Sequence, residues 1–162
     1  MAERPTSERR SGCPVSVALE LLGDRWSLLI VRDLMVRGLR TFKEFQESGE
    51  GIATNILTSR LQRLEGAGVL CAEAQETDRR RANYRLTRKG IGLAPVLLEL
   101  LIWGAQHEST GVPRGFALNM ERNREAVLAE VRRRWRERDV TPLIPKFEDG
   151  NVAQKSNKRR KR

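Results

Sequence analysis

The feature that most constrains this fold is a stretch near residue 100 that would be apolar on almost every side of a helix. About 15 helical residues span only ~22 Å, which is too short to cross a bilayer, and Glu99 interrupts them. A chain of 162 residues cannot easily bury every side of a peripheral helix, so we expect a subunit interface to cover the surplus. The alternative is a central helix enclosed by its own chain. The apolar residues are Ile91, Leu93, Ala94, Val96, Leu97, Leu98, Leu100, Leu101, Ile102 and Trp103.

Helical patterns also fill the first third of the chain. An apolar stripe predicts a helix from Pro14 that ends at Gly23, and Asp24 can cap a second helix that stops at Gly38. A Thr-Phe-Lys-Glu sequence at 41–44 is a capping box, in which the Thr hydroxyl and the Glu carboxylate each bond an otherwise unpaired amide. It predicts a short third helix.

The middle of the chain predicts one more helix, a hairpin and the long apolar helix. We expect a helix over Ala53–Glu65, strands over Val69–Glu73 and Ala82–Leu86, and a helix from Thr87 to about Gln106, with a kink or break at Pro95. The order is helix, helix, short helix, helix, strand, tip, strand, helix. This is an α+β, mostly α layout, a winged helix-turn-helix with a two-stranded wing and a C-terminal helical extension. One helix of such a fold fits the major groove, and the hairpin tip reaches the neighbouring backbone or minor groove.

The helix over 53–65 would present a polar face opposite its core leucines. Asn and Gln can bond adenine bidentately, and Ser or Thr can reach bases or phosphates. The alternative is an ordinary solvated helix face. The candidate DNA-binding residues of this helix are Thr54, Asn55, Thr58, Ser59, Gln62 and Arg63.

The hairpin tip concentrates positive charge. Residues 78–89 hold six basic side chains and one acidic side chain. Adjacent arginines repel one another unless an anion lies nearby, so we expect contact with DNA phosphates or the minor groove; a solvated turn is the alternative. The tip residues assigned to DNA are Arg79, Arg80 and Arg81.

The net charge of +10 is unevenly spread, because residues 111–162 hold 15 basic and 7 acidic side chains. This imbalance favours a polyanionic partner. We expect a disordered N-terminal arm over 1–12, a DNA-binding domain over 13–108, a linker over 109–118, an amphipathic helix over 119–140 and a basic disordered tail over 141–162.

Composition argues against several classes of protein. The chain has two cysteines and a single histidine, His107, so we expect no structural zinc site, no other metal or cofactor, and no nucleophile–base pair of an enzyme. No apolar run reaches the ~18 residues of a membrane helix, and the first residues lack the apolar stretch of a signal peptide. We therefore expect neither a membrane protein nor a secreted one.

Together the motifs over about residues 13–107 resemble the HxlR-type winged-helix regulators, in the family's order and spacing. They are Cys13–Val15, Gly23–Ile30, Arg40–Phe45, Ile56–Leu61, Leu64–Val69 and Tyr84–Gly90. The resemblance implies a homodimeric bacterial transcription factor related to the MarR type, in the cytoplasm and associated with the nucleoid. It also implies that residues 53–65 are the recognition helix and 77–83 the wing tip.

In that family the first and last helices of the domain form the dimer. This implies an interface that includes Val17, Leu21, Leu97, Leu101 and Trp103. The chain departs from the family in having Ala-Thr rather than Ser-Pro at the start of the recognition helix. Because Ala caps poorly, we expect Thr54 to cap one residue later.

Cys13 precedes the first helix, where amides and the helix dipole lower a thiol pKa. Some family members sense oxidants or electrophiles through a cysteine at the matching position, so the resemblance implies a redox or small-molecule effector. The alternative is an inert thiol.

Our first hypothesis is a sequence-specific regulator that binds double-stranded DNA as a homodimer. The alternatives are a protein-interaction module built on a winged helix and an RNA-binding accessory protein led by the basic tail.

Overall fold

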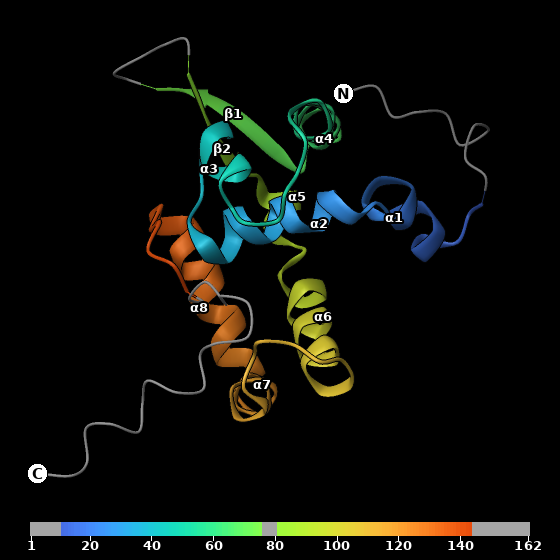
Figure 1. Cartoon of the computed structure of the whole chain (residues 1–162), viewed down its shortest axis with the longest axis vertical. Coiled ribbons are helices and arrows are strands. Elements are labelled where there is room, and N and C mark those ends of the chain that lie inside the picture. Colours follow the sequence, from blue (N-terminus) through green and yellow to red (C-terminus); the bar gives the residue numbers. More distant parts are fainter. Residues whose placement is uncertain (1–10, 76–80, 144–162) are drawn as a thin grey trace, which may run out of the picture.

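A computed structural model of the chain describes residues 11–75 and 81–143. Most of the predicted N-terminal arm, most of the wing tip and most of the basic tail lie outside these residues. Figure 1 shows a hairpin of two strands at one end of a mostly helical molecule. In chain order the elements are α1 (Pro14–Leu22), α2 (Arg25–Arg32), the π-helical η2 (Asp33–Arg37), α3 (Phe42–Gln46), α4 (Thr54–Gly66), β1 (Leu70–Ala74), β2 (Ala82–Leu86), α5 (Arg88–Ile91), α6 (Ala94–His107), α7 (Arg114–Arg122) and α8 (Arg124–Glu137).

The predicted capping box at the start of α3 is confirmed. The Glu44 amide donates to Thr41 Oγ1 at 3.3 Å, and the Thr41 amide donates to Glu44 Oε2 at 2.7 Å. These bonds satisfy donors that the helix itself leaves unpaired. Burial alone would raise the pKa of Glu44, but the amides of Arg40 and Thr41 hold that pKa below its ordinary value.

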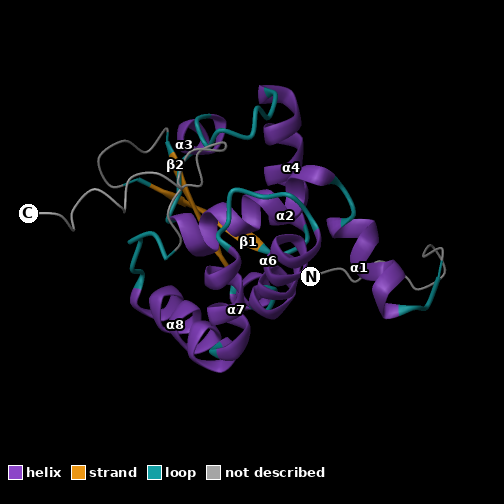
Figure 2. Cartoon of the chain, turned by 60° about the horizontal axis from the view of Figure 1, so that its bottom comes forward, coloured by secondary structure: helices purple, strands orange, loops and turns teal. Residues whose placement is uncertain are grey.

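The predicted hairpin is confirmed as an antiparallel pair of strands, drawn in orange in Figure 2. Leu70 lies opposite Leu86, and Ala74 lies opposite Ala82. The segment before α3 adds a short third pairing, because the Tyr84 amide donates to the Arg40 carbonyl at 2.7 Å. The hairpin is therefore joined to the segment that begins α3, which orients it relative to the helices.

One apolar core holds α2, α3, α4 and the hairpin together. Its most enclosed side chains come from elements far apart in the sequence, which fixes their relative positions. They are Val31, Leu34, Phe45, Leu57, Leu64, Val69 and Leu70.

The expected single helix from Thr87 to Gln106 is two helices. α5 ends at Ile91, and α6 begins at Ala94. Pro95 lies in the first turn of α6, where its missing amide proton would have had no partner. The break that Pro95 predicted therefore falls just before it.

By length and mean hydropathy alone, Arg88–His107 would pass as a membrane-spanning segment, and a third of that stretch is buried in the structure. Its two helices are separated at residues 92–93, and α6 has 14 residues. At 1.5 Å per residue, α6 spans about 21 Å, whereas a bilayer core is about 30 Å thick. α6 alone is therefore shorter than the bilayer core is thick.

The expected linker over 109–118 and single helix over 119–140 differ from the structure. α7 already begins at Arg114, and Asn123 separates it from α8. Pro113 precedes α7, and the buried Ala117 and Met120 tie this helix to the core. The composition of residues 109–118 suggested a linker. The burial of Ala117 and Met120 depends on tertiary contacts, which the composition does not show.

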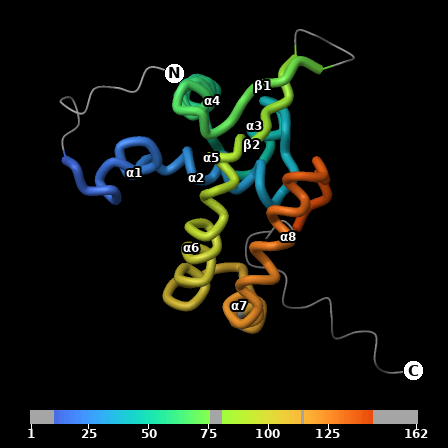
Figure 3. The backbone as a smooth tube through the Cα atoms, turned by 180° about the vertical axis from the view of Figure 1, so that it is seen from behind, coloured from blue at the N-terminus to red at the C-terminus, as the bar shows by residue number. Residues whose placement is uncertain are grey.

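The C-terminal extension, which we define as α7, α8 and residues 138–143, docks on the winged-helix part. Trp135 Nε1 donates to the Leu86 carbonyl at 2.7 Å, and Arg138 pairs with Glu73 at 3.0 Å. The Leu143 amide donates to the Val36 carbonyl at 2.7 Å. Figure 3 shows α8 beside the hairpin and α7 against α6. The extension thus spans from the hairpin to the far end of α6.

The closest backbone contact between α5 and the hairpin generates a stability prediction. A methyl group at Gly90 would lie 2.1 Å from the Val69 carbonyl oxygen, whereas a methyl group at Gly66 would meet open space. Gly90→Ala should lower the free energy of unfolding by about 1–3 kcal/mol. Gly66→Ala should leave it unchanged or raise it by up to ~1 kcal/mol. Urea unfolding at one fixed protein concentration measures both; equal midpoints would contradict the close packing.

Candidate nucleic-acid interface

The polar face predicted for the recognition helix lies on the solvent side of α4. Leu57, Leu61 and Leu64 are buried on the opposite side. Figures 1 and 3 place α4 and the hairpin at the same end of the molecule, away from α7. A helix and a neighbouring hairpin at one end can approach a duplex together. The exposed residues of this face are Thr54, Asn55, Thr58, Ser59, Gln62 and Arg63.

The first turn of α4 is held by α3. Ala53 is the capping residue and has no side-chain cap, so the expectation that Thr54 caps the helix is wrong. Thr54 Oγ1 instead accepts a bond from Gln46 Nε2 at 2.7 Å, and Thr58 Oγ1 donates to the Thr54 carbonyl at 2.9 Å. The two hydroxyls are engaged within the protein.

Within the described residues, the side chains of Asn55, Ser59 and Gln62 make no hydrogen bond to the protein, and all three are exposed. They lie on α4 at the spacing of one helix face, four and three residues apart. Their amide and hydroxyl groups are therefore available to base edges or phosphates.

The Arg63 side chain was predicted to be available to DNA, but it bonds another helix of the protein. Its guanidinium donates to the Glu20 carbonyl of α1. The bond satisfies a carbonyl in the last turn of α1 and holds that helix against α4. The sequence gives no sign of it, because the two residues are 43 positions apart.

Asp24 connects α2 to α4. Its Oδ1 accepts from the Trp26 and Ser27 amides at 2.9 and 3.0 Å, and its Oδ2 accepts from the buried Ser27 hydroxyl at 2.6 Å. Arg60 Nε of α4 lies 3.0 Å from Oδ1, without the orientation of a hydrogen bond, so this contact is an ion pair. Burial alone would raise the pKa of Asp24, but the Ser27 hydroxyl, the two amides and Arg60 together lower it.

The structure describes only part of the basic run of the wing, and one of its arginines has a structural role. Arg79 and Arg80 lie outside the described residues, and Arg81 is exposed at the start of the second strand. Arg85 faces α8, where its Nη2 donates to the Trp135 carbonyl at 2.7 Å and its guanidinium lies 5.4 Å from the indole centroid. Arg85 therefore helps to hold α8 of the extension against the hairpin.

Helices α1 and α6 carry most of the large apolar side chains that the described part of the chain leaves exposed. On α1 these are Val15, 66% exposed, and Leu19, 58% exposed; on α6 they are Val96, Leu100 and Trp103, which are 46%, 48% and 57% exposed. Figures 1 and 2 show α1 projecting from the body of the molecule. These five residues form what we call the uncovered apolar face.

Of the residues predicted for a dimer interface, Trp103 belongs to this face. Val17, Leu21, Leu97 and Leu101 are half-buried within the chain. The sequence predicted an interface on these two helices but did not show which side of each the described chain covers. Contacts with α2 and α4 cover part of α1, and contacts with α7 and α8 cover part of α6.

Cys13 is exposed at the N-terminus of α1. The backbone amides of Ser16 and Val15 lower the pKa of its thiol, in the direction expected at a helix start. Cys71 is half-buried in β1. Among the described residues, no three His, Cys, Asp or Glu side chains are grouped as metal ligands.

Residues 21–111 match the HxlR-like helix-turn-helix family. YdeP of Bacillus subtilis strain 168, an uncharacterised HTH-type transcriptional regulator, is 31% identical over 103 residues, which are 64% of this chain and 80% of YdeP. The crystal structure of PA1607, a proposed transcription factor, superimposes with a TM-score of 0.59 at 43% identity and covers 65% of this chain and 72% of that one. The redox regulator HypR in its oxidised form gives a TM-score of 0.54 at 28% identity, over 60% of this chain and 100% of HypR.

The contacts of Asp24 predict how the free energy of unfolding depends on pH. Asp24→Ala should lower the free energy of unfolding by about 1–2 kcal/mol, and Asp24→Asn by less, because the amide oxygen still caps α2. Since the folded-state pKa of Asp24 lies below its ordinary value of 3.8, its stabilisation is present above that pH and is lost as pH falls through the lower folded-state pKa.

Urea unfolding of the wild type and of Asp24→Asn from pH 7 to pH 2.5 measures this loss. The difference between them should stay constant near neutral pH and shrink below about pH 3.8. A difference that grew on acidification would contradict the assignment.

Proposed function

Since the chain belongs to the HxlR-like helix-turn-helix family of transcriptional regulators, we propose that it binds double-stranded DNA in a sequence-specific manner as a homodimer, in the cytoplasm of a bacterium. Each subunit inserts α4 into a major groove, and the wing contacts the adjacent backbone or minor groove. Two half-sites then lie about one helical turn, ~34 Å, apart.

The observation that carries this proposal is the exposed face of α4. Asn55, Ser59 and Gln62 stand free at the same end of the molecule as the hairpin. An amide that can both donate and accept suits the adenine edge in the major groove. The hydroxyl of Ser59 suits a base or a phosphate.

The homodimer is supported by the uncovered apolar face. Leu19 and Trp103 are more than half exposed, and large apolar side chains grouped on projecting helices mark interaction surfaces. A twofold dimer would bury α1 and α6 of each subunit and would place two recognition helices on one duplex.

The other readings make different predictions. A protein-interaction module would show negligible duplex binding at physiological salt. An RNA-binding accessory protein would keep its binding without the wing and lose it without residues 144–162. The relatives described above, YdeP and PA1607, are an HTH-type transcriptional regulator and a proposed transcription factor, which favours the regulator over an enzyme.

A redox input at Cys13 stays a prediction. Its support is the exposed thiol with a lowered pKa and the similarity to a redox regulator, HypR.

DNA reading by α4 can be tested on sites selected from fragmented genomic DNA. Asn55→Ala and Gln62→Ala should each weaken binding to the selected site by about 5–150-fold, while binding to random duplex changes little. Gln106→Ala, which removes the same type of amide at the far end of α6, is the matched control. Equal losses on selected and random DNA would contradict base reading.

A salt series can separate the contribution of residues 144–162 to DNA binding from that of α4. Protein 1–143 should select the same palindrome as the full chain, with a shallower dependence of log K on log salt by about 0.9 for each lost phosphate contact. If protein 1–143 retained no DNA and the full chain retained all sequences equally, the tail would be the binder and the proposal would fail.

The dimer can be tested by light scattering across a concentration series. Leu19→Glu and Trp103→Glu should weaken dimerisation by about 30-fold or more, because each places an unpaired carboxylate in an apolar interface. Leu118→Glu changes an apolar residue of α7 that is 43% exposed and lies outside the uncovered apolar face, so it should have no effect. A wild-type chain that stays monomeric would refute the dimer.

A further inference from the structure

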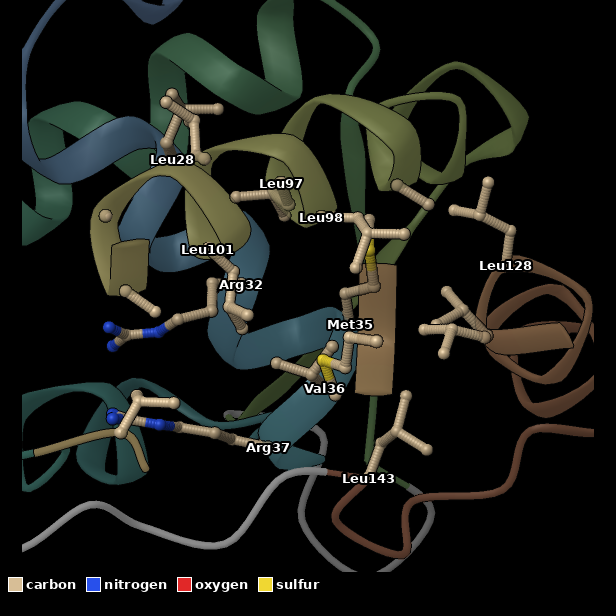
Figure 4. Close-up of a pocket in the computed structure, with 18 of the residues that line it drawn as sticks. Leu28, Arg32, Met35, Val36, Arg37, Leu97, Leu98, Leu101, Leu128 and Leu143 are labelled. Atoms are coloured by element: carbon tan, nitrogen blue, oxygen red, sulfur yellow. The ribbon is translucent and has the colours of Figure 1, made fainter. Parts of the chain in front are cut away.

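A cavity of about 360 Å³ lies between α6, the α2–η2 segment and the C-terminal extension. Figure 4 shows its walls: Leu97 and Leu101 come from α6, Met35 and Val36 from η2, and Leu128 from α8. The volume falls within the ~300–1,000 Å³ of ligand sites in proteins.

Much of this cavity exists only because the extension is present. Val127, Leu128 and Val131 of α8 and Met120 of α7 form one wall, and all four lie beyond the family match over residues 21–111. The cavity is thus a property of this chain's own C-terminal part.

The polar groups at the rim already have partners. Arg32 bonds Glu50 at 2.8 Å and Asp33 at 2.7 Å, and Arg37 lies 3.3 Å from both Asp33 Oδ1 and the Ser48 carbonyl. In Figure 4 both guanidiniums point away from Leu128 and Leu143. Thr110 Oγ1 accepts a bond from the Val112 amide at 3.3 Å.

A charged ligand would lose its hydration among the apolar walls, where the described side chains offer no polar partner. An apolar ligand would be stabilised here by the burial of its surface against the apolar side chains of the walls. The chemical class that fits is a compact, uncharged and mainly hydrocarbon or aromatic molecule.

α8 links this cavity to the wing. Its first turns line the cavity with Val127 and Val131, and one turn later Trp135 bonds the Leu86 carbonyl of β2. Arg138, just beyond α8, pairs with Glu73 of β1 at 3.0 Å. A rigid helix that touches both sites transmits a displacement from one to the other.

We propose that the cavity between α6, η2 and α8 binds a compact uncharged apolar small molecule, and that its occupancy shifts α8 against the β1–β2 hairpin. Ligand binding and the shift of the hairpin stand on the geometry alone. Their effect on DNA affinity rests on the proposed function.

The first test is titration of the full chain with N-phenyl-1-naphthylamine, an uncharged probe that fluoresces in apolar surroundings. Saturable binding of one probe per chain is expected. Gly104→Leu and Val127→Phe, on opposite walls, should weaken it at least ~10-fold by filling the space. A side chain at Gly104 starts in open space, so the helix itself can accept it.

Gly115→Leu is the matched control, because Gly115 is also open to a side chain but lies outside the cavity walls. It should bind the probe like the wild type, and circular dichroism and light scattering should show all variants folded with unchanged mass. Absence of saturable binding, or equal binding by the filled variants, would overturn the proposal. Binding only after removal of residues 144–162 would assign the cavity to the chain's own tail and overturn it as well.

The second test is hydrogen exchange of the hairpin amides with and without probe. Exchange in Ala82–Leu86 should change by several-fold in the wild type. Trp135→Phe should still bind the probe but lose this change, because it removes the bond from the indole to the Leu86 carbonyl. An unchanged hairpin in the wild type would refute the link. Neither readout uses DNA, so failure here is distinguishable from failure of DNA binding.

Discussion

Helix α6 is apolar on most of its sides, and exposing those sides to water costs free energy. The arrangement of the other elements follows from how each side of α6 is covered. Ala94, Leu98 and Ile102 are buried by the chain itself. A second side meets the extension across a partly empty cavity, and a third side, with Val96 and Trp103, is left uncovered. One side of this all-apolar helix is thus enclosed by the chain, as the second reading predicted. Coverage of the exposed side by a second subunit, the first reading, stays a prediction.

Local rules were sufficient for α2, α3 and α4, the helices of the helix-turn-helix part. A capping residue and a periodic apolar stripe predicted α2 and α4, and a four-residue motif predicted the cap of α3 down to its two reciprocal bonds. The polar side of α4 followed from its leucines, because 100° per residue leaves little freedom once the core side is known. These features depend on neighbours within a few positions in the sequence.

The remaining features depend on residues far apart, and the sequence did not predict them. Arg63 was predicted to face DNA, but its guanidinium bonds the Glu20 carbonyl. Arg85 was counted only in the basic run of the wing, and the sequence did not show its bond to the Trp135 carbonyl. The start of α7 at Arg114 and the covered sides of α1 and α6 are set by tertiary packing. The cavity is invisible in the sequence, since it is the space that three separate segments fail to fill.

The long reach of the extension's contacts also orders the events of synthesis. Trp135 bonds a residue 49 positions earlier, and Arg138 bonds one 65 positions earlier. Because a chain emerges from the ribosome N-terminus first and its parts fold as they appear, the hairpin and α6 emerge before α8 does. For that interval the underside of the hairpin and one flank of α6 face the solvent, and a nascent chain that stalls there exposes surface suited to misassembly. The emergence of the last turns of α8 is therefore the step after which these surfaces of the hairpin and α6 can be covered.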